Sequence, residues 1–243
     1  MATLVTPERT EAEILAEDVD TLTPSWFLEN PNILVLDFPS LIAQGEAFNR
    51  MAAFIEKRGI PHDRVLNDAE LAEAIQADNA TAATYYYGHD YRAADIQRFY
   101  ATVDAEHLPL TPPERGLRTL LDAEGILKPY ANKAVISIPR RGSDPFVDES
   151  GRESLLRHEL SHGEYFTDPG YASYVQKFWA TRMTDSDRSI FRSFLTRQGY
   201  DPANDDLMMN EMQAHLMNTT DRRYFNAAAC GITADRLQVL RHA

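Results

Sequence analysis

Apolar residues recur at helical spacing over most of this chain, whereas only three short segments have the pattern of strands. The helical spacing predicts helices over residues 8–18, 40–57, 68–77, 111–125, 171–181 and 184–199, with further helices after Asp90, Ser150, Asp201 and Asp221. Strands are predicted over residues 32–38, 84–87 and 133–139. The pattern therefore predicts an α+β fold that is mostly helical.

Prolines set the first 31 residues apart from the rest. Pro7, Pro24 and Pro31 interrupt any long element, so residues 1–31 are expected to form an N-terminal arm that packs on the body of the protein. Residues 32–243 contain no internal repeat and no low-complexity segment. They are expected to form a single domain.

The strongest chemical pattern lies on the helix predicted after Ser150. Ser150 and Glu153 have the spacing of a capping box, and the leucines that follow predict a partly buried helix. His158 and His162 are four residues apart, so both imidazoles lie on one face and can bind the same cation. Glu159 lies beside that face, where it can deprotonate a water that the cation acidifies.

The segment His158-Glu159-Leu160-Ser161-His162 resembles the HExxH motif of the zincin metallohydrolases. The resemblance implies a zincin-like domain with a few short strands beside this helix. It also implies a zinc ion held by His158 and His162, and hydrolysis by a metal-bound water that Glu159 activates. Iron, manganese or cobalt suits the same ligands. The alternative is an incidental pair of histidines on a core or surface helix.

Two later carboxylates are candidates for the third metal ligand. Glu211 lies in Asn210-Glu211-Met212-Gln213-Ala214, which resembles the N-E-x-x-A helix of gluzincins. Its apolar neighbours predict burial, and a cation would offset the cost of burying a carboxylate. Asp168 has the offset of the third ligand in metzincins, but Tyr165 occupies the position where that family has glycine. We favour Glu211 and keep Asp168 as the alternative third ligand.

The gluzincin resemblance covers the two motifs and the helical order between them. Glu164 and His215 stay open as other third ligands, as does a site without one. Thermolysin-like members have an aspartate four residues after the ligand glutamate, where this chain has His215. The carboxylate that orients a ligand histidine is therefore expected elsewhere, at Asp168, Asp90 or Glu164.

Residues outside the two motifs are expected to bind the substrate. His89, Tyr91 and Tyr224 are candidate donors to the oxyanion of the reaction. The aromatic stretch around His89 is also typical of a strand–helix corner in which Asp90 caps the helix. The strand over 133–139 is expected to border the cleft as an edge strand, where an extended peptide can add to it.

Charge and composition exclude several classes of partner. The chain has 24 Lys and Arg against 37 Asp and Glu, a net charge of −13, so nucleic acid and anionic membrane surfaces are not expected as partners. Cys230 is alone, which excludes an intramolecular disulfide. The chain lacks a signal-peptide pattern and a long apolar run, which predicts a soluble, cytoplasmic protein; a removed export signal would leave no trace.

These observations lead to three hypotheses about function. The first is a zinc metallohydrolase, most readily a metalloprotease or amidase, acting on a peptide or a small amide-containing substrate. The second is a metalloenzyme of the same architecture that acts on a small metabolite, since fold and metal do not determine the substrate. The third is a non-catalytic helical module with a structural metal or none, in which Glu159 has no role.

Overall fold

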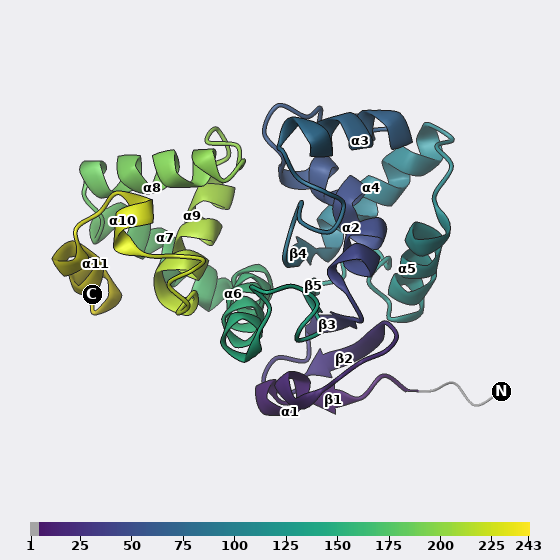
Figure 1. Ribbon diagram of the computed structural model, residues 1–243, viewed down its shortest axis with the longest axis horizontal. Coiled ribbons are helices and arrows are strands. Elements are labelled where there is room, and N and C mark those ends of the chain that lie inside the picture. Colours follow the sequence, from purple (N-terminus) through teal and green to yellow (C-terminus); the bar gives the residue numbers. More distant parts are fainter. Residues whose placement is uncertain (1–4) are drawn as a thin grey trace.

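The computed structural model describes residues 5–243, which fold into a five-stranded sheet and two groups of helices (Figure 1). The strands are β1 (Glu8–Arg9), β2 (Thr23–Phe27), β3 (Ile33–Phe38), β4 (His89–Arg92) and β5 (Ala134–Pro139). Their order across the sheet is β1-β2-β3-β5-β4. β1 and β2 are parallel, as are β3 and β5, while β2 pairs antiparallel with β3 and β4 antiparallel with β5.

Helices make up most of the described chain, which confirms the predicted α+β, mostly helical fold. The helices are α1 (Glu11–Ala16), α2 (Leu41–Glu56), α3 (Asp68–Ala77), α4 (Ala93–Ala105), α5 (Pro112–Ala123), α6 (Glu149–Thr167), α7 (Pro169–Thr181), α8 (Asp185–Arg197), α9 (Asp205–Gln213), the π-helix η1 (Ala214–Asn218), α10 (Ala227–Cys230) and α11 (Ala234–Arg241). The helix starts predicted at Ser40, Thr111 and Thr184 are confirmed, because each side chain accepts a hydrogen bond from a first-turn backbone amide.

The central strand β3 is buried on both faces of the sheet. Successive side chains of a strand point to opposite faces, so Leu34 and Leu36 pack with α2, α4 and α5, whereas Ile33 and Val35 pack with α6. Gly163 lies where α6 meets β3, and a Cβ at this position would lie 2.7 Å from Ile33 Cδ1. The missing side chain therefore allows α6 to approach the sheet.

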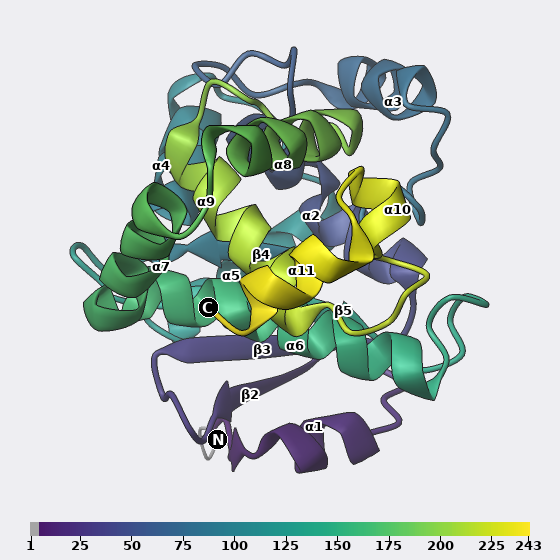
Figure 2. The ribbon, with the colours of Figure 1, turned by 90° about the vertical axis from the view of Figure 1, so that its left-hand side faces the viewer.

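Helix α6 separates the sheet from the C-terminal helices, α7 to α11 (Figure 1). These helices enclose a core of their own, which includes Phe191, Phe194, Met212 and Phe225. Figure 2 faces the C-terminal helices and shows α6 running behind them across the molecule. The predicted histidine helix is thus in contact with both halves of the fold.

The N-terminal segment contributes two strands that the sequence pattern did not predict. β2 pairs along β3 from Thr23↔Asp37 to Trp26↔Leu34, and β1 pairs with the end of β2. The sequence pattern did not predict β2 because this segment is polar and contains Pro24, and proline is rare in strands that pair on both sides. Pro24 is tolerated here because β1 pairs only with Trp26 and Phe27.

Three local predictions were wrong. The aromatic run 84–87 is not a strand; the strand begins at His89, and Asp90 lies within it instead of capping α4. Asp148, whose side chain accepts from the Gly151 amide, caps α6 in place of Ser150. The strand predicted over 133–139 is β5, and it is not an edge strand, because it pairs with β3 on one side and with β4 on the other. The edge of the sheet on this side is β4.

Within residues 5–243, none of the helices has both the length and the apolar character needed to cross a membrane.

Candidate metal centre

His158 and His162 point from α6 into the interior, and each is at most 9% exposed. Their Nε2 atoms are 3.1 Å apart. Two nitrogen lone pairs at this distance repel each other unless a proton or a cation lies between them. Two ligands that are each about 2.1 Å from one zinc ion are separated by no more than ~4.2 Å. The spacing of the two imidazoles therefore fits a shared ion.

Glu211 extends from α9 toward the same point. Its Oε1 lies 3.7 Å from His162 Nε2, and its Oε2 lies 3.9 Å from His158 Nε2. The residue is 1% exposed, and neither carboxylate oxygen has a hydrogen-bond partner among residues 5–243. A buried carboxylate without partners is costly. A cation bound by Glu211 and the two histidines would remove that cost.

Thr219, just beyond η1, orients the first histidine. Its hydroxyl donates to the Ala214 carbonyl at 3.1 Å and lies 2.7 Å from His158 Nδ1. Because the single hydroxyl hydrogen goes to Ala214, His158 Nδ1 must be the donor in the second bond. The Nε2 lone pair of His158 is then free for a cation. The orienting partner of His158 is thus a threonine and not a carboxylate, whereas His162 Nδ1 has no hydrogen-bond partner among the described residues.

Two other side chains approach the centre from opposite sides. Asp90 on β4 places Oδ2 3.7 Å from His162 Nε2, and His215 in η1 places Nε2 3.9 Å from Glu211 Oε2. The centre consequently contains two overlapping groups with ligand spacing, His158–Glu211–His215 and Asp90–His162–Glu211. Glu211 belongs to both groups, whereas His158 and His162 belong to different ones and face different oxygens of its carboxylate.

The remaining carboxylates considered from the sequence lie outside these groups. Asp168 is exposed, and its side chain caps α7 by accepting from the Gly170 and Tyr171 amides. Glu164 accepts a hydrogen bond from Asn30 Nδ2. The geometry therefore favours Glu211 over Asp168 as a ligand.

Burial determines the protonation of the centre. It lowers the pKa of His162 to about 4 and that of His215 to about 3, so both imidazoles are neutral near neutral pH. Burial also raises the pKa of Glu211 well above its ordinary value, and the neighbouring carboxylates of Glu56 and Glu159 raise it further. Neutral imidazoles with free lone pairs, and a carboxyl that exchanges a proton for a cation, are the ligand chemistry that a divalent metal needs.

Glu159 lies against the backbone of Gly88, in the turn before β4. A Cβ at Gly88 would be 2.1 Å from Glu159 Oε1, so any other residue would displace the carboxylate. Within the described chain, Glu159 Oε2 has no hydrogen-bond partner. Burial and then the nearby Glu56 raise the pKa of Glu159 well above its ordinary value. Such a carboxylate is a stronger base than an exposed glutamate.

A cavity of about 320 Å³ adjoins this carboxylate. Glu159, His158 and His215 line it from the side of the centre. The aromatic residues that line it are Tyr85, Tyr86, Tyr87, Tyr200 and Tyr224. A small polar ligand, or one side chain of a larger ligand, fits a space of this size.

Of the three predicted oxyanion donors, only Tyr224 lines this cavity. Its hydroxyl donates to the Phe146 carbonyl. His89 stacks on Phe48 at a centroid distance of 4.8 Å, and its Nδ1 lies 3.0 Å from Ser137 Oγ. Tyr91 donates its hydroxyl hydrogen to Glu56 at 3.3 Å. His89 and Tyr91 thus lie away from the cavity that Glu159 lines.

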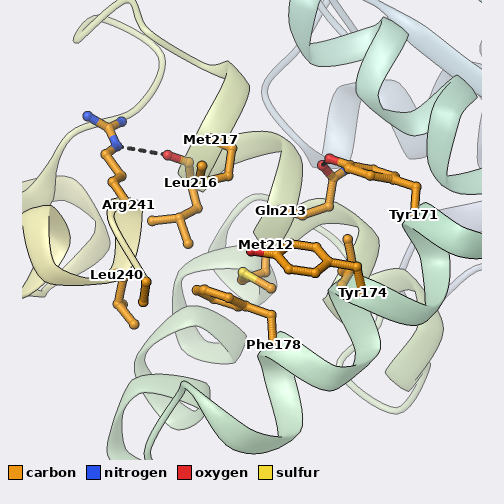
Figure 3. Close-up of a pocket in the computed structure, with 11 residues that line it drawn as sticks. Tyr171, Tyr174, Phe178, Met212, Gln213, Leu216, Met217, Leu240 and Arg241 are labelled. Atoms are coloured by element: carbon orange, nitrogen blue, oxygen red, sulfur yellow. Dashed lines mark hydrogen bonds between the residues drawn. The ribbon is translucent and has the colours of Figure 1, made fainter.

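Two other cavities offer less to a reaction. One of about 310 Å³ lies on the Asp90 side of the centre, between β4 and α9. The other, of about 50 Å³, is apolar and lies behind η1, where Met212 and Leu216 line it together with Tyr174 and Phe178 (Figure 3). Figure 3 shows Arg241 hydrogen-bonded to the Leu216 carbonyl, and the Tyr171 hydroxyl donates to Gln213 Oε1 at 2.7 Å. These polar groups already have partners, so the centre on α6 remains the candidate site.

Comparison of the chain with protein-family models, with the curated proteins and with the solved structures finds no match.

Sequence reasoning did not identify four residues at the site. Gly88, Thr219 and Tyr200 contact the centre or its cavity, and Glu56 adds a buried carboxylate on α2. Thr219 follows Glu211 by eight residues, which on a regular α-helix would turn it roughly 80° away from Glu211. Only Glu56 had a sequence signal, as a charged residue on the apolar face of a predicted helix.

Proposed function

We propose that this protein is a zinc-dependent hydrolase that cleaves a peptide or a small amide. The observation that carries the proposal is the convergence of His158 Nε2 and His162 Nε2, 3.1 Å apart, on a buried Glu211 carboxylate without a partner among the described residues. His158, His162 and Glu211 would hold the ion. When bound there, zinc acidifies a water molecule and polarises a carbonyl group.

The chain's own residues supply the remaining functions. Glu159 accepts the proton of the attacking water and returns it to the leaving amine, a role for which burial has raised its pKa. Gly88 keeps the carboxylate in place by leaving room for it. Thr219 holds His158 in the tautomer that binds metal. Tyr224 and Tyr200 are placed in the cavity to contact the substrate.

Two features support different substrates. The edge strand β4 runs beside the centre and offers backbone groups to which an extended peptide can add, which supports a peptidase. The cavity of about 320 Å³ lies at the small end of ligand pockets, which supports a small-metabolite substrate as the second candidate. A structural metal module has no use for a glutamate held beside a cavity, so we place that alternative last.

The test is Glu159→Gln in the zinc-loaded protein. The amide has the shape of the carboxylate but cannot take the proton, so turnover of quenched peptides or small acyl amides should fall ~10²- to 10⁴-fold while about one zinc per chain stays bound. Glu153→Gln is the matched control, because Glu153 lies on the same helix and, among the described residues, pairs with Arg157 at its surface. Unchanged turnover in Glu159→Gln contradicts Glu159 as the base, no turnover by the zinc-loaded wild type contradicts a hydrolase of these substrates, and His158→Ala with full zinc content contradicts the metal centre.

A further inference from the structure

His215 is the third imidazole of the centre, and its distances to Glu211 and His158 are those expected between ligands of one metal ion. Its Nε2 lies 3.9 Å from Glu211 Oε2, within the ~4.2 Å that can separate two ligands of one ion. One nitrogen of its ring lies within 4.8 Å of a ligand atom of His158 and of Glu211. A regular gluzincin pattern has no histidine here, so the resemblance does not account for it.

Apart from the cavity that it lines, the surroundings of His215 are apolar. Its ring packs against Phe194 and Phe225 at centroid distances of 5.2 and 5.4 Å. In residues 5–243, its Nδ1 has no hydrogen-bond partner. An apolar ring would fill this space without the cost of burying polar nitrogen atoms. Ligation by Nε2 would give that nitrogen a partner and so offset part of the cost, while Nδ1–H would stay without one among the described residues.

The π-helix η1 explains how one segment can contribute several groups to the centre. On an α-helix each residue turns about 100°, so Thr219 would lie roughly 80° away from the face of Glu211. The wider turn of η1, closed by the bond from the Thr219 amide to the Ala214 carbonyl at 2.9 Å, reduces this rotation. Glu211, His215 and Thr219 thereby face α6 together. Single π-turns of this kind occur frequently at functional sites.

We propose that His215 is a fourth protein ligand, so that the centre has three imidazoles and one carboxylate. This inference rests on the proposed metal centre and adds to its ligand set. Four protein ligands occupy every coordination position of a tetrahedral ion. A five- or six-coordinate ion keeps one or two positions for water or substrate. The centre therefore selects a divalent ion that accepts five or more ligands, such as cobalt, nickel, iron or manganese, or zinc in an expanded five-coordinate state.

Cobalt(II) loaded into the full chain provides a direct count of the imidazoles. Each coordinated imidazole has a ring N–H proton whose NMR signal the paramagnetic ion shifts far from the normal range. We expect three such signals in the wild type, two in His215→Ala, and three in the control His242→Ala, because His242 is exposed. Two signals in the wild type would overturn the fourth ligand and leave the proposed function standing. A wild type that binds no cobalt or zinc would overturn both.

Affinity gives a second readout that does not depend on catalysis. Loss of a ligand should weaken zinc binding by more than ~100-fold, because changes to residues that only orient a ligand cost about 10- to 100-fold. Competition with a chelator should therefore show that His215→Ala binds zinc more than ~100-fold more weakly than the wild type, and that His242→Ala binds zinc with unchanged affinity. A change below tenfold in folded His215→Ala would contradict the proposal. The wild-type signal count stands independently if this variant fails to fold.

Discussion

Helix α6 carries two buried polar regions that differ in how their hydrogen bonds are satisfied. Near its start, Arg152 is 1% exposed, and its three guanidinium nitrogens donate to the carbonyls of Ile14, Leu15 and Pro139 and to the Asp37 carboxylate. Two turns later, His158, Glu159 and His162 are equally enclosed, but the groups that face them from α9 and β4 stand at 3.7 to 3.9 Å.

The difference separates a structural polar cluster from a binding site. Buried polar groups in folded proteins are nearly always hydrogen-bonded, and each exception needs an explanation. Arg152 meets this rule and ties the N-terminal segment to α6. Glu211, with two oxygens that lack partners in the described chain, does not meet it, and a cation is the simplest explanation. Burial alone therefore identifies neither role. In the described chain the Arg152 region leaves one buried oxygen without a partner, Asp37 Oδ1, and its other carboxylate oxygen accepts from Arg152, whereas both oxygens of Glu211 lack a partner.

The largest expected effect is the loss of metal affinity in Glu211→Ala. This change removes the one carboxylate ligand and leaves only imidazoles facing a gap, so zinc affinity should fall by several orders of magnitude. Asp168→Asn is the control, because Asp168 is exposed and only caps α7. Thermal melts with and without zinc measure the difference, since a ligand of the native state stabilises it by RT ln(1 + [L]/Kd). The reverse ranking of the two variants would remove Glu211 from the centre.

Arg152→Ala should change stability without changing the metal centre. It leaves Asp37 buried without its cation, and breaking a buried pair in this way costs about 3–5 kcal/mol. Chemical denaturation should show this loss, while zinc content stays near one per chain in the folded fraction. The double variant Arg152→Met/Asp37→Leu is the control and should recover most of the loss, because no charge stays unpaired. Loss of zinc from folded Arg152→Ala would mean that the two regions of α6 are coupled.

Thr219→Val tests the orientation of His158 with an intermediate effect. Valine keeps the shape of threonine but cannot accept the hydrogen bond from His158 Nδ1, so zinc affinity should fall about 10- to 100-fold. Thr219→Ser retains the hydroxyl and should bind zinc nearly as well as the wild type. Chelator competition measures the zinc affinity of the wild type, Thr219→Val and Thr219→Ser. Equal affinities in the two variants would show that the hydroxyl does not orient His158.

The smallest effect is the pH dependence of metal affinity. Burial raises the pKa of Glu211 well above its ordinary value, so the ion-free centre keeps a proton on this carboxyl to a higher pH than an exposed glutamate would, and that proton must leave when a cation binds. Zinc affinity should therefore rise with pH, about tenfold per unit for each proton released. Because burial lowers the pKa of His162 to about 4, the imidazoles add no dependence between about pH 6 and pH 8. A flat affinity profile over this range would contradict a protonated carboxyl in the centre.

The site shows which inferences a sequence supports. The four-residue spacing of His158 and His162 implied that they share a helix face, and the structure places their Nε2 atoms 3.1 Å apart. Glu211 was favoured because its apolar neighbours implied burial, and the structure places it opposite both histidines. Asp90 was expected to cap a helix, yet it lies in β4 beside His162, because pairing with β5 outweighs the local capping tendency.

The sequence by itself determined the mostly helical α+β fold and the face that α6 presents, because helical periodicity and side-chain spacing are local properties. Tertiary structure alone decided that β4 is the edge strand, that Gly88 leaves room for Glu159, and that Thr219 holds His158. These contacts join residues 42 or more positions apart in the chain, or depend on a π-turn that no spacing rule anticipates. The order of strands and the register of η1 follow from packing between segments, on which a local pattern carries no information.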